Sequence, residues 1–208
     1  MNQQPPHPPK VTFLVPAYVP HVGGIGELRN LGRCLDSIEA QTDPAWEVVL
    51  VHDGEMPDAV YRVARAMRER TGRVTFFHVP YRGIRGGHHS VEAGKYRAHA
   101  ASEFLYILNG DNLVRPEFVE RMYHADADIV TCWVKMHDMP GRILDGRAFQ
   151  RGAIDRANYM IRADVARRTA HHMHLDADYD YLMDAYQFIS ETRPVRVAHV
   201  DAVLAEHH

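Results

Sequence analysis

The stretch from Phe104 to Asn112 constrains this chain more than any other. It reads Phe-Leu-Tyr-Ile-Leu-Asn-Gly-Asp-Asn, so five apolar residues stop abruptly at four small polar ones. Five apolar residues are too few for an ordinary helix and are typical of a strand buried on both faces. Open α/β folds bind ligands at the carboxyl ends of such strands, where Asp111 would present its carboxylate. The same tetrapeptide is compatible with a plain turn, because Asn, Gly and Asp all favour turns.

The composition indicates a soluble globular protein. The chain has 208 residues, of which 46% are hydrophobic and 25% charged, which suits one fair-sized domain. Its net charge is −3, and the sequence contains no block of like charge. Nucleic acid is therefore not an expected partner. Cys34 and Cys132 lie in apolar patterns typical of buried free thiols. We find neither a secretory leader nor an apolar run long enough to cross a bilayer, and we expect a cytoplasmic protein.

Strand and helix patterns alternate through the first 125 residues. We expect strands over 11–15 (stopped by Pro16), 47–51, 74–79 and 104–108, with helices over 28–38, from Pro57 to Gly72, over 91–101 and from Pro116. This alternation predicts right-handed βαβ units and a mainly parallel sheet flanked by helices. The carboxyl ends of parallel strands share one edge, so Asp53 and Asp111 should converge on one ligand.

The remaining residues, 126–208, are less regular. We expect strands over 129–134, 158–161 and 195–200, a helix from Ala163, and a helix that opens in the acidic segment at 176–184. The segment 137–157 has little periodicity, which is typical of a binding loop or a lid. Residues 1–10 are rich in proline and predict an unstructured arm. Residues 11–208 therefore form one domain with two halves.

The order of these features resembles a family 2 glycosyltransferase with the GT-A fold. Val-Pro-Ala-Tyr is similar to the end of the family's first strand, and Val-His-Asp-Gly resembles its Asp-Asp-Gly-Ser turn. The opening stretch and the Pro-Glu-Phe after it look like the Asp-x-Asp metal motif and the helix that follows. Ala-Asp-Tyr-Asp resembles the Glu-Asp-Trp-Asp segment that supplies the catalytic base. In this sequence the four landmarks lie at 15–18, 51–54, 106–118 and 177–180.

The resemblance implies a Rossmann-like half over 11–125 that binds a nucleotide-sugar co-substrate, with UDP as the expected nucleotide. It also implies a divalent cation, Mn²⁺ or Mg²⁺, which suits oxygen ligands. Asn109 replaces an acid of the metal motif and should weaken metal binding, while its amide can still bind a ribose hydroxyl. The donor-binding residues implied are Pro16, Tyr18, Asp53, Arg85, Lys95, Asn109 and Asp111.

The metal ligands implied are Asp111 and a histidine from the far C-terminal segment, either His208 or His207, with His199 as an inner alternative. The terminal pair is either native or the remnant of a purification tag. Family members transfer the sugar with inversion, and the acid aligned with Asp178 removes the acceptor's proton. Asp180 is the alternative base. The half at 126–208 would bind the acceptor, whether a glycan, a lipid or a small molecule.

Two other classes of protein fit parts of the pattern. A nucleotidyltransferase uses a similar half-sheet and metal carboxylate, but it usually carries a basic Gly-rich loop after the first strand. Here Gly23, Gly24 and Gly26 follow that strand with little positive charge nearby. A degenerate, non-catalytic nucleotide-binding protein is favoured by His52 and Asn109, since both stand where the family has acids.

Overall fold

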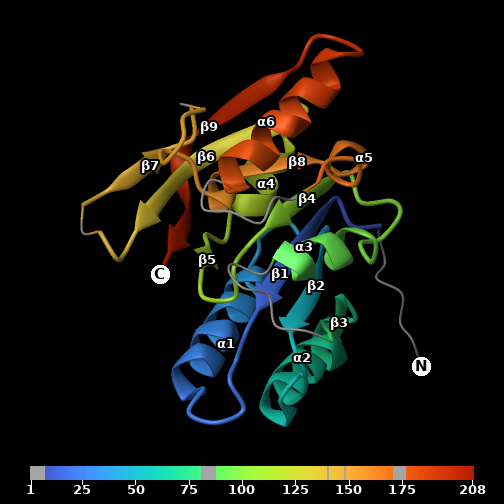
Figure 1. The fold of residues 1–208 in the computed structure, drawn as a ribbon, viewed down its shortest axis with the longest axis vertical. Helices are drawn as coiled ribbons and strands as arrows, with labels where there is room; N and C mark the ends of the chain where they lie inside the picture. The colour runs from blue at the N-terminus through green and yellow to red at the C-terminus, as the bar shows by residue number, and fades with distance from the viewer. Residues whose placement is uncertain (1–7, 81–87, 140, 148, 171–176) are drawn as a thin grey trace.

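The structure is a computed structural model of the chain, and it describes residues 8–80, 88–139, 141–147, 149–170 and 177–208. Its centre is a nine-stranded sheet in the order β3-β2-β1-β4-β8-β6-β9-β5, with β7 paired to β6 off this path (Figure 1). The strands are β1 (Val11–Ala17), β2 (Trp46–Asp53), β3 (Val74–Val79), β4 (Phe104–Ile107), β5 (Leu113–Val114), β6 (Ile129–Met136), β7 (Ile143–Asp145), β8 (Tyr159–Arg162) and β9 (Val197–His207).

Helices cover both faces of the sheet. They are α1 (Ile25–Glu39), α2 (Asp58–Thr71), α3 (His88–Lys95), α4 (Phe118–Tyr123), α5 (Ala163–Ala166) and α6 (Ala177–Ser190). Alternate residues of the central strands point to opposite faces, so Phe13 packs in one core with α1, α2 and α4, while Leu14 packs in a second core with α3, α5 and α6. None of the helices described is long and apolar enough to span a membrane.

The first half confirms the expected alternation. Strands β3, β2, β1 and β4 are all parallel neighbours. Every residue of β4 is buried, as the apolar run predicts. The helix boundaries differ slightly, because Pro57 is the N-cap of α2, not its first residue, and α3 covers His88–Lys95 instead of 91–101. Gly72 ends α2 in a left-handed conformation, with φ of 69°.

Strand β1 continues through Pro16, contrary to the prediction that Pro16 stops it. Pro16 pairs with Val51 of β2, and its carbonyl accepts a hydrogen bond from Gly110 on the β4 side. Regular pairing between β1 and β4 ends at Leu14 and Ile107. The missing N–H of Pro16 therefore removes no bond from the sheet, because its neighbouring strand has already ended there.

The second half departs from the parallel pattern. Strand β8 is antiparallel to both β4 and β6, and β5 is antiparallel to β9. The segment 137–157 is not a structureless loop, because β7 within it forms a hairpin with β6. Strand β9 runs to His207, well past the predicted end at residue 200. Its residues are mostly half-buried, so they lack the apolar alternation that marks a strand in sequence.

The buried carboxylate of Asp128 anchors this half. It accepts two hydrogen bonds from the Arg193 guanidinium, at 2.6 and 2.7 Å, and one from the backbone N–H of Arg196 at 2.9 Å. Arg193 lowers the pKa of Asp128, and burial opposes that effect. The side chain thus fixes the start of β9 to the start of β6.

Candidate active site

The first part of the site lies at the carboxyl ends of β2 and β4, which flank β1. Asp53 ends β2 and is buried, and its carboxylate accepts a hydrogen bond from the Ser90 hydroxyl of α3. Asp111 lies in the turn after β4, on the other side of β1. The two acids therefore share one edge of the sheet, as predicted, and are separated by the width of β1.

His52, which replaces an acid of the family pattern, supports the backbone beside this edge. Its Nε2 accepts a hydrogen bond from the N–H of Val19 at 3.0 Å, and its Nδ1 lies 3.1 Å from the carbonyl of Gly54. Since an N–H only donates and a carbonyl only accepts, the ring carries its proton on Nδ1. Tyr18, 38% exposed, stacks on this imidazole with 5.9 Å between ring centroids. This role of His52 could not be predicted from its neighbours in the sequence.

The turn that carries Asp111 is tightly held. The N–H of Asn112 donates to the carbonyl of Asn109 at 2.9 Å, and Gly110 donates to Pro16 at 3.1 Å. A Cβ on Gly110 would lie 3.2 Å from the Cβ of Ala17, so glycine allows the turn to approach β1. Asp111 itself is exposed, and partial desolvation raises its pKa while the charges of His207 and His208 oppose the rise.

A second group of residues, from the other half of the chain, interacts electrostatically with Asp111. His207, at the end of β9, has its Nδ1 3.2 Å from a carboxylate oxygen of Asp155. Contact with Asp155 raises the pKa of His207, and the charge of Asp111 adds to the rise. Burial would raise the pKa of Asp155, but His207 and Arg156 outweigh it, and the pKa is lowered. His207 is thus held by Asp155 at a place where the charge of Asp111 also reaches it.

Asp178, the expected base, lies in the first turn of α6 beside the same group. Its carboxylate accepts a hydrogen bond from Nε of the buried Arg156 at 3.0 Å. Burial raises the pKa of Asp178, the charge of Arg156 lowers it, and the charge of Asp155 raises it. Asp180 instead forms an ion pair with the exposed Arg151 at 2.5 Å. Asp178 therefore interacts with Arg156 and Asp155, while Asp180 pairs with Arg151.

Three sequence predictions need comment. Lys95 was expected to bind phosphate, but it is fully buried and donates to Glu92 at 2.6 Å and to the carbonyl of Thr169 at 2.7 Å. That prediction is wrong, because helix α3 directs the ammonium into the interior, where burial also lowers its pKa. Arg85 lies outside the described residues. His208 stacks on His137, with 4.0 Å between ring centroids, so it is His207 that contacts Asp155.

The residues around Asp111 suit a divalent cation. Asp111 offers an exposed carboxylate, His207 an imidazole, and Asn109 an amide with no hydrogen bond to any residue that the structure describes. One carboxylate, a neutral oxygen and an imidazole form a donor set that Mn²⁺ accepts readily and Mg²⁺ less so.

Asp155 and Arg156 were missed by the sequence predictions. Asp155 caps a short 3₁₀ turn at Arg156–Asn158, because its carboxylate accepts from Ala157 and its own N–H donates to Asn158 at 2.8 Å. An Asp followed three residues later by Asn is a capping pattern that was visible in the sequence. It predicts only the local turn, however, and not its contacts with β9 and α6.

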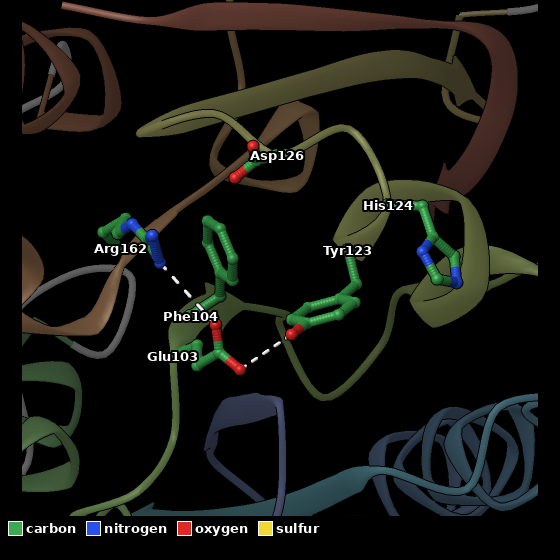
Figure 2. Close-up of a pocket in the computed structure, with 6 residues that line it drawn as sticks. All are labelled: Glu103, Phe104, Tyr123, His124, Asp126 and Arg162. Atoms are coloured by element: carbon green, nitrogen blue, oxygen red, sulfur yellow. Dashed lines mark hydrogen bonds and ion pairs between the residues drawn. The ribbon is translucent and has the colours of Figure 1, made fainter.

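A separate cavity of about 180 Å³ lies at the opposite end of β4 (Figure 2). Figure 2 shows Tyr123 and Arg162 pointing toward Glu103, with Tyr123 donating to that carboxylate at 2.7 Å and Arg162 3.7 Å from it. These groups satisfy one another at the amino end of the strand, far along it from Asp111. We do not assign this cavity to the active site.

The chain belongs to glycosyl transferase family 2, whose family model matches residues 25–144. That match begins with α1, after β1, includes β2, β4 and the Asp111 turn, and reaches the hairpin of β6 and β7. No curated protein matches the chain by sequence.

Solved structures share its fold. TarS of S. aureus has a TM-score of 0.73 at 13% identity, and the match covers 95% of this chain and 36% of that one. The mannosyltransferase PcManGT of Pyrobaculum calidifontis, solved with GDP-Man and Mn²⁺, has a TM-score of 0.66 at 20% identity over 98% of this chain and 58% of that one. The 4-diphosphocytidyl-2C-methyl-D-erythritol synthase of Anaerococcus prevotii reaches 0.53 at 15% identity. The fold is therefore GT-A, and this chain spans about a third to three fifths of the length of TarS and PcManGT.

Proposed function

We propose that this chain transfers a hexosyl group from a nucleotide-sugar donor to an acceptor hydroxyl, with inversion at the anomeric carbon. The observation that carries the proposal is a set of interacting charged side chains. His207 contacts Asp155 and Arg156 contacts Asp178, while charge interactions relate Asp111 to His207 and Asp155 to Arg156. This set connects the residue expected beside the donor diphosphate to the residue expected to act on the acceptor.

The donor proposed is a UDP-sugar. TarS has been solved with UDP-GlcNAc and with UDP, whereas PcManGT was solved with GDP-Man. In this chain the buried Asp53 has carboxylate oxygens suited to the imide N–H of uracil, and the exposed ring of Tyr18 offers a stacking surface beside it. Asn109 is suited to a ribose hydroxyl.

Asp111 and His207 would hold a divalent cation, which supplies positive charge to the diphosphate as it leaves. The remaining steps belong to the chain's own residues. Asp178 accepts the proton of the acceptor hydroxyl while that oxygen bonds to the anomeric carbon and the bond to the nucleoside diphosphate breaks. Burial raises the pKa of Asp178, and Arg156 opposes that rise and orients the carboxylate, because its guanidinium donates to one carboxylate oxygen. Attack opposite the leaving group gives inversion.

With the structure in view, His52 and Asn109 give less support to a non-catalytic nucleotide-binding protein than their identities in the sequence did. The ring of His52 satisfies two backbone groups next to Asp53, so its replacement of an acid has a structural explanation. Asn109 keeps an amide at the site while removing one negative charge. We therefore expect reduced affinity for the cation and not its loss.

The test is release of UDP from UDP-sugars in the presence of Mn²⁺, measured for the wild type and for Asp111→Ala. Removing the carboxylate should lower the rate at least about 100-fold, since leaving-group stabilisation of this kind contributes several kcal/mol. Asp36→Ala on the exposed face of α1 is the matched control and should have no effect. Equal rates for Asp111→Ala and wild type would contradict the proposal. A thermal-shift panel adds discrimination, because stabilisation by nucleoside triphosphates alone would favour a nucleotidyltransferase.

A further inference from the structure

A second cluster of metal-binding side chains lies where β6, β9 and β5 meet. His137 follows the last residue of β6, Glu206 lies near the end of β9, and His208 follows β9. The ligand atoms of these three side chains all lie within 4.8 Å of one another. Within the described part of the chain it is the one group of three or more such residues, and neither Asp111 nor His207 belongs to it.

The cluster lies beside the proposed donor site, since the charge of His208 acts on Asp111, but Glu206 and His207 have different partners. Successive side chains of a strand point to opposite faces, so Glu206 and His207 are directed apart. His207 contacts Asp155, whereas Glu206 contacts His137 at 2.8 Å and Arg115 at 2.7 Å. A ligand bound by Glu206 and a ligand bound by His207 would therefore occupy separate places.

The backbone around the cluster is already fixed. The N–H of His137 donates to the carbonyl of His207 at 2.8 Å, and the N–H of His208 donates to the side-chain oxygen of Asn112 at 3.2 Å. Arg115 binds one oxygen of Glu206 and leaves the other, Oε2, facing the two imidazoles. A ligand held by a neighbouring side chain in this way is oriented for metal binding.

The two imidazole rings of the cluster lie face to face. They are parallel within 11°, with 4.0 Å between their centroids. The Nε2 of His208 is buried without a hydrogen-bond partner among the described residues and lies 3.9 Å from Oε2 of Glu206. A buried acceptor atom of this kind requires a partner.

We propose that His137, Glu206 and His208 bind a divalent transition-metal ion of the Zn²⁺ class, at a site separate from that of the donor cation. Two imidazoles and one carboxylate are ligands that Zn²⁺ prefers over Mg²⁺, and they leave a fourth position for water. The ion replaces the hydrogen bond between His137 and Glu206 and ties the end of β6 to the end of β9. It therefore fixes the strand end that carries His207.

The test is Zn²⁺ binding to the full chain, made without a histidine tag, in excess Mg²⁺ and with no nucleotide present. Competition with a chromophoric chelator gives the dissociation constant. We expect one site whose affinity falls at least about tenfold in His137→Ala and in His208→Ala, because even the loss of an outer hydrogen-bond partner weakens metal sites by that factor. His124→Ala, exposed and outside the cluster, should bind as the wild type does.

Two further results decide the matter. In hydrogen exchange, Zn²⁺ should protect the amides of residues 204–208 in the wild type and not in His137→Ala, which is partly exposed and should fold normally. His207→Ala should keep the Zn²⁺ affinity. If His207→Ala loses it while His137→Ala retains it, the ion occupies the donor site and the proposal is wrong. Because no donor or acceptor is used, this result is independent of transferase activity.

Discussion

The two halves of the molecule place their site residues by different means. In the first half, Asp53 and Asp111 follow parallel strands that both pair with β1, so one rule of sheet geometry brings them to a common edge. In the second half, Asp155 reaches His207 across 52 residues of sequence and Asp178 reaches Arg156 across 22. The first arrangement depends on buried strands, and the second on ion pairs. Changes in the two halves should therefore have different consequences.

Replacing Asp178 should have the strongest effect on turnover. It tests whether catalysis in the second half can be separated from donor binding in the first. Asp178→Asn should lower kcat about 1,000-fold or more, because an amide cannot accept the acceptor's proton. The affinity for UDP should stay unchanged, since Asp178 lies outside the half that binds the nucleotide. Steady-state kinetics and calorimetry measure the two quantities.

Asp180→Asn is the matched control for this experiment. Asp180 lies one half-turn further along α6 and pairs with the exposed Arg151, so kcat should change little. A large loss in Asp180→Asn together with normal turnover in Asp178→Asn would transfer the role of base to Asp180.

A second change tests how strongly the second half depends on a buried ion pair. Asp128→Asn should lower the free energy of unfolding by about 2–4 kcal/mol, because it leaves the Arg193 guanidinium with a weaker partner. The pKa of Asp128 is lowered in the folded state, so its contribution is present above the unfolded pKa of about 3.9 and disappears as pH falls through the folded value.

Denaturant unfolding at several pH values measures this effect. The gap between wild type and Asp128→Asn should be full at pH 7 and should narrow below about pH 4. Asp126→Asn is the control, since that side chain is 80% exposed and Asn tolerates its φ of 41°. A gap that persists unchanged at low pH would show that the ion pair is not its source.

The matching change in the first half should alter binding and leave the chemistry intact. Asp53→Ala should weaken UDP binding about 10- to 100-fold, as expected for the loss of a hydrogen bond between a carboxylate and a base, with kcat at saturating donor nearly unchanged. Ser90→Ala removes the hydroxyl that donates to Asp53 but keeps the carboxylate. It should therefore bind UDP better than Asp53→Ala does, and equal losses would assign the effect to packing.

The smallest effect is a shift in the pH profile. Arg156 lowers the pKa of Asp178, so Arg156→Gln should raise that pKa and move the acidic limb of kcat to higher pH. Arg151→Gln, which removes the partner of Asp180, should leave the limb in place. A limb that does not move in Arg156→Gln would mean that Asp178 is not the titrating base.

The elements of the first half could be predicted from residue patterns alone. Unbroken apolar runs predict buried strands such as β4, and the helical spacing of Leu31, Leu35 and Ile38 predicts α1. Both patterns are visible because a buried position requires an apolar residue. From these elements, the shared edge of Asp53 and Asp111 followed. The extension of β1 through Pro16 did not follow, since it depends on where the neighbouring strand β4 ends.

The contacts of the second half could not be predicted in this way, because they depend on how distant segments pack. The local sequence does not distinguish His207 from His208. In the structure, His207 contacts Asp155 and His208 stacks on His137. Lys95 has the charge of a phosphate ligand, yet the packing of α3 makes it an interior residue. Ion pairs between distant segments leave no periodic pattern in a sequence, because a charged residue has the same identity whether it binds a substrate or another side chain. Buried strands can therefore be recognised in this sequence, whereas the tertiary fold determines which charged side chains come together at the site.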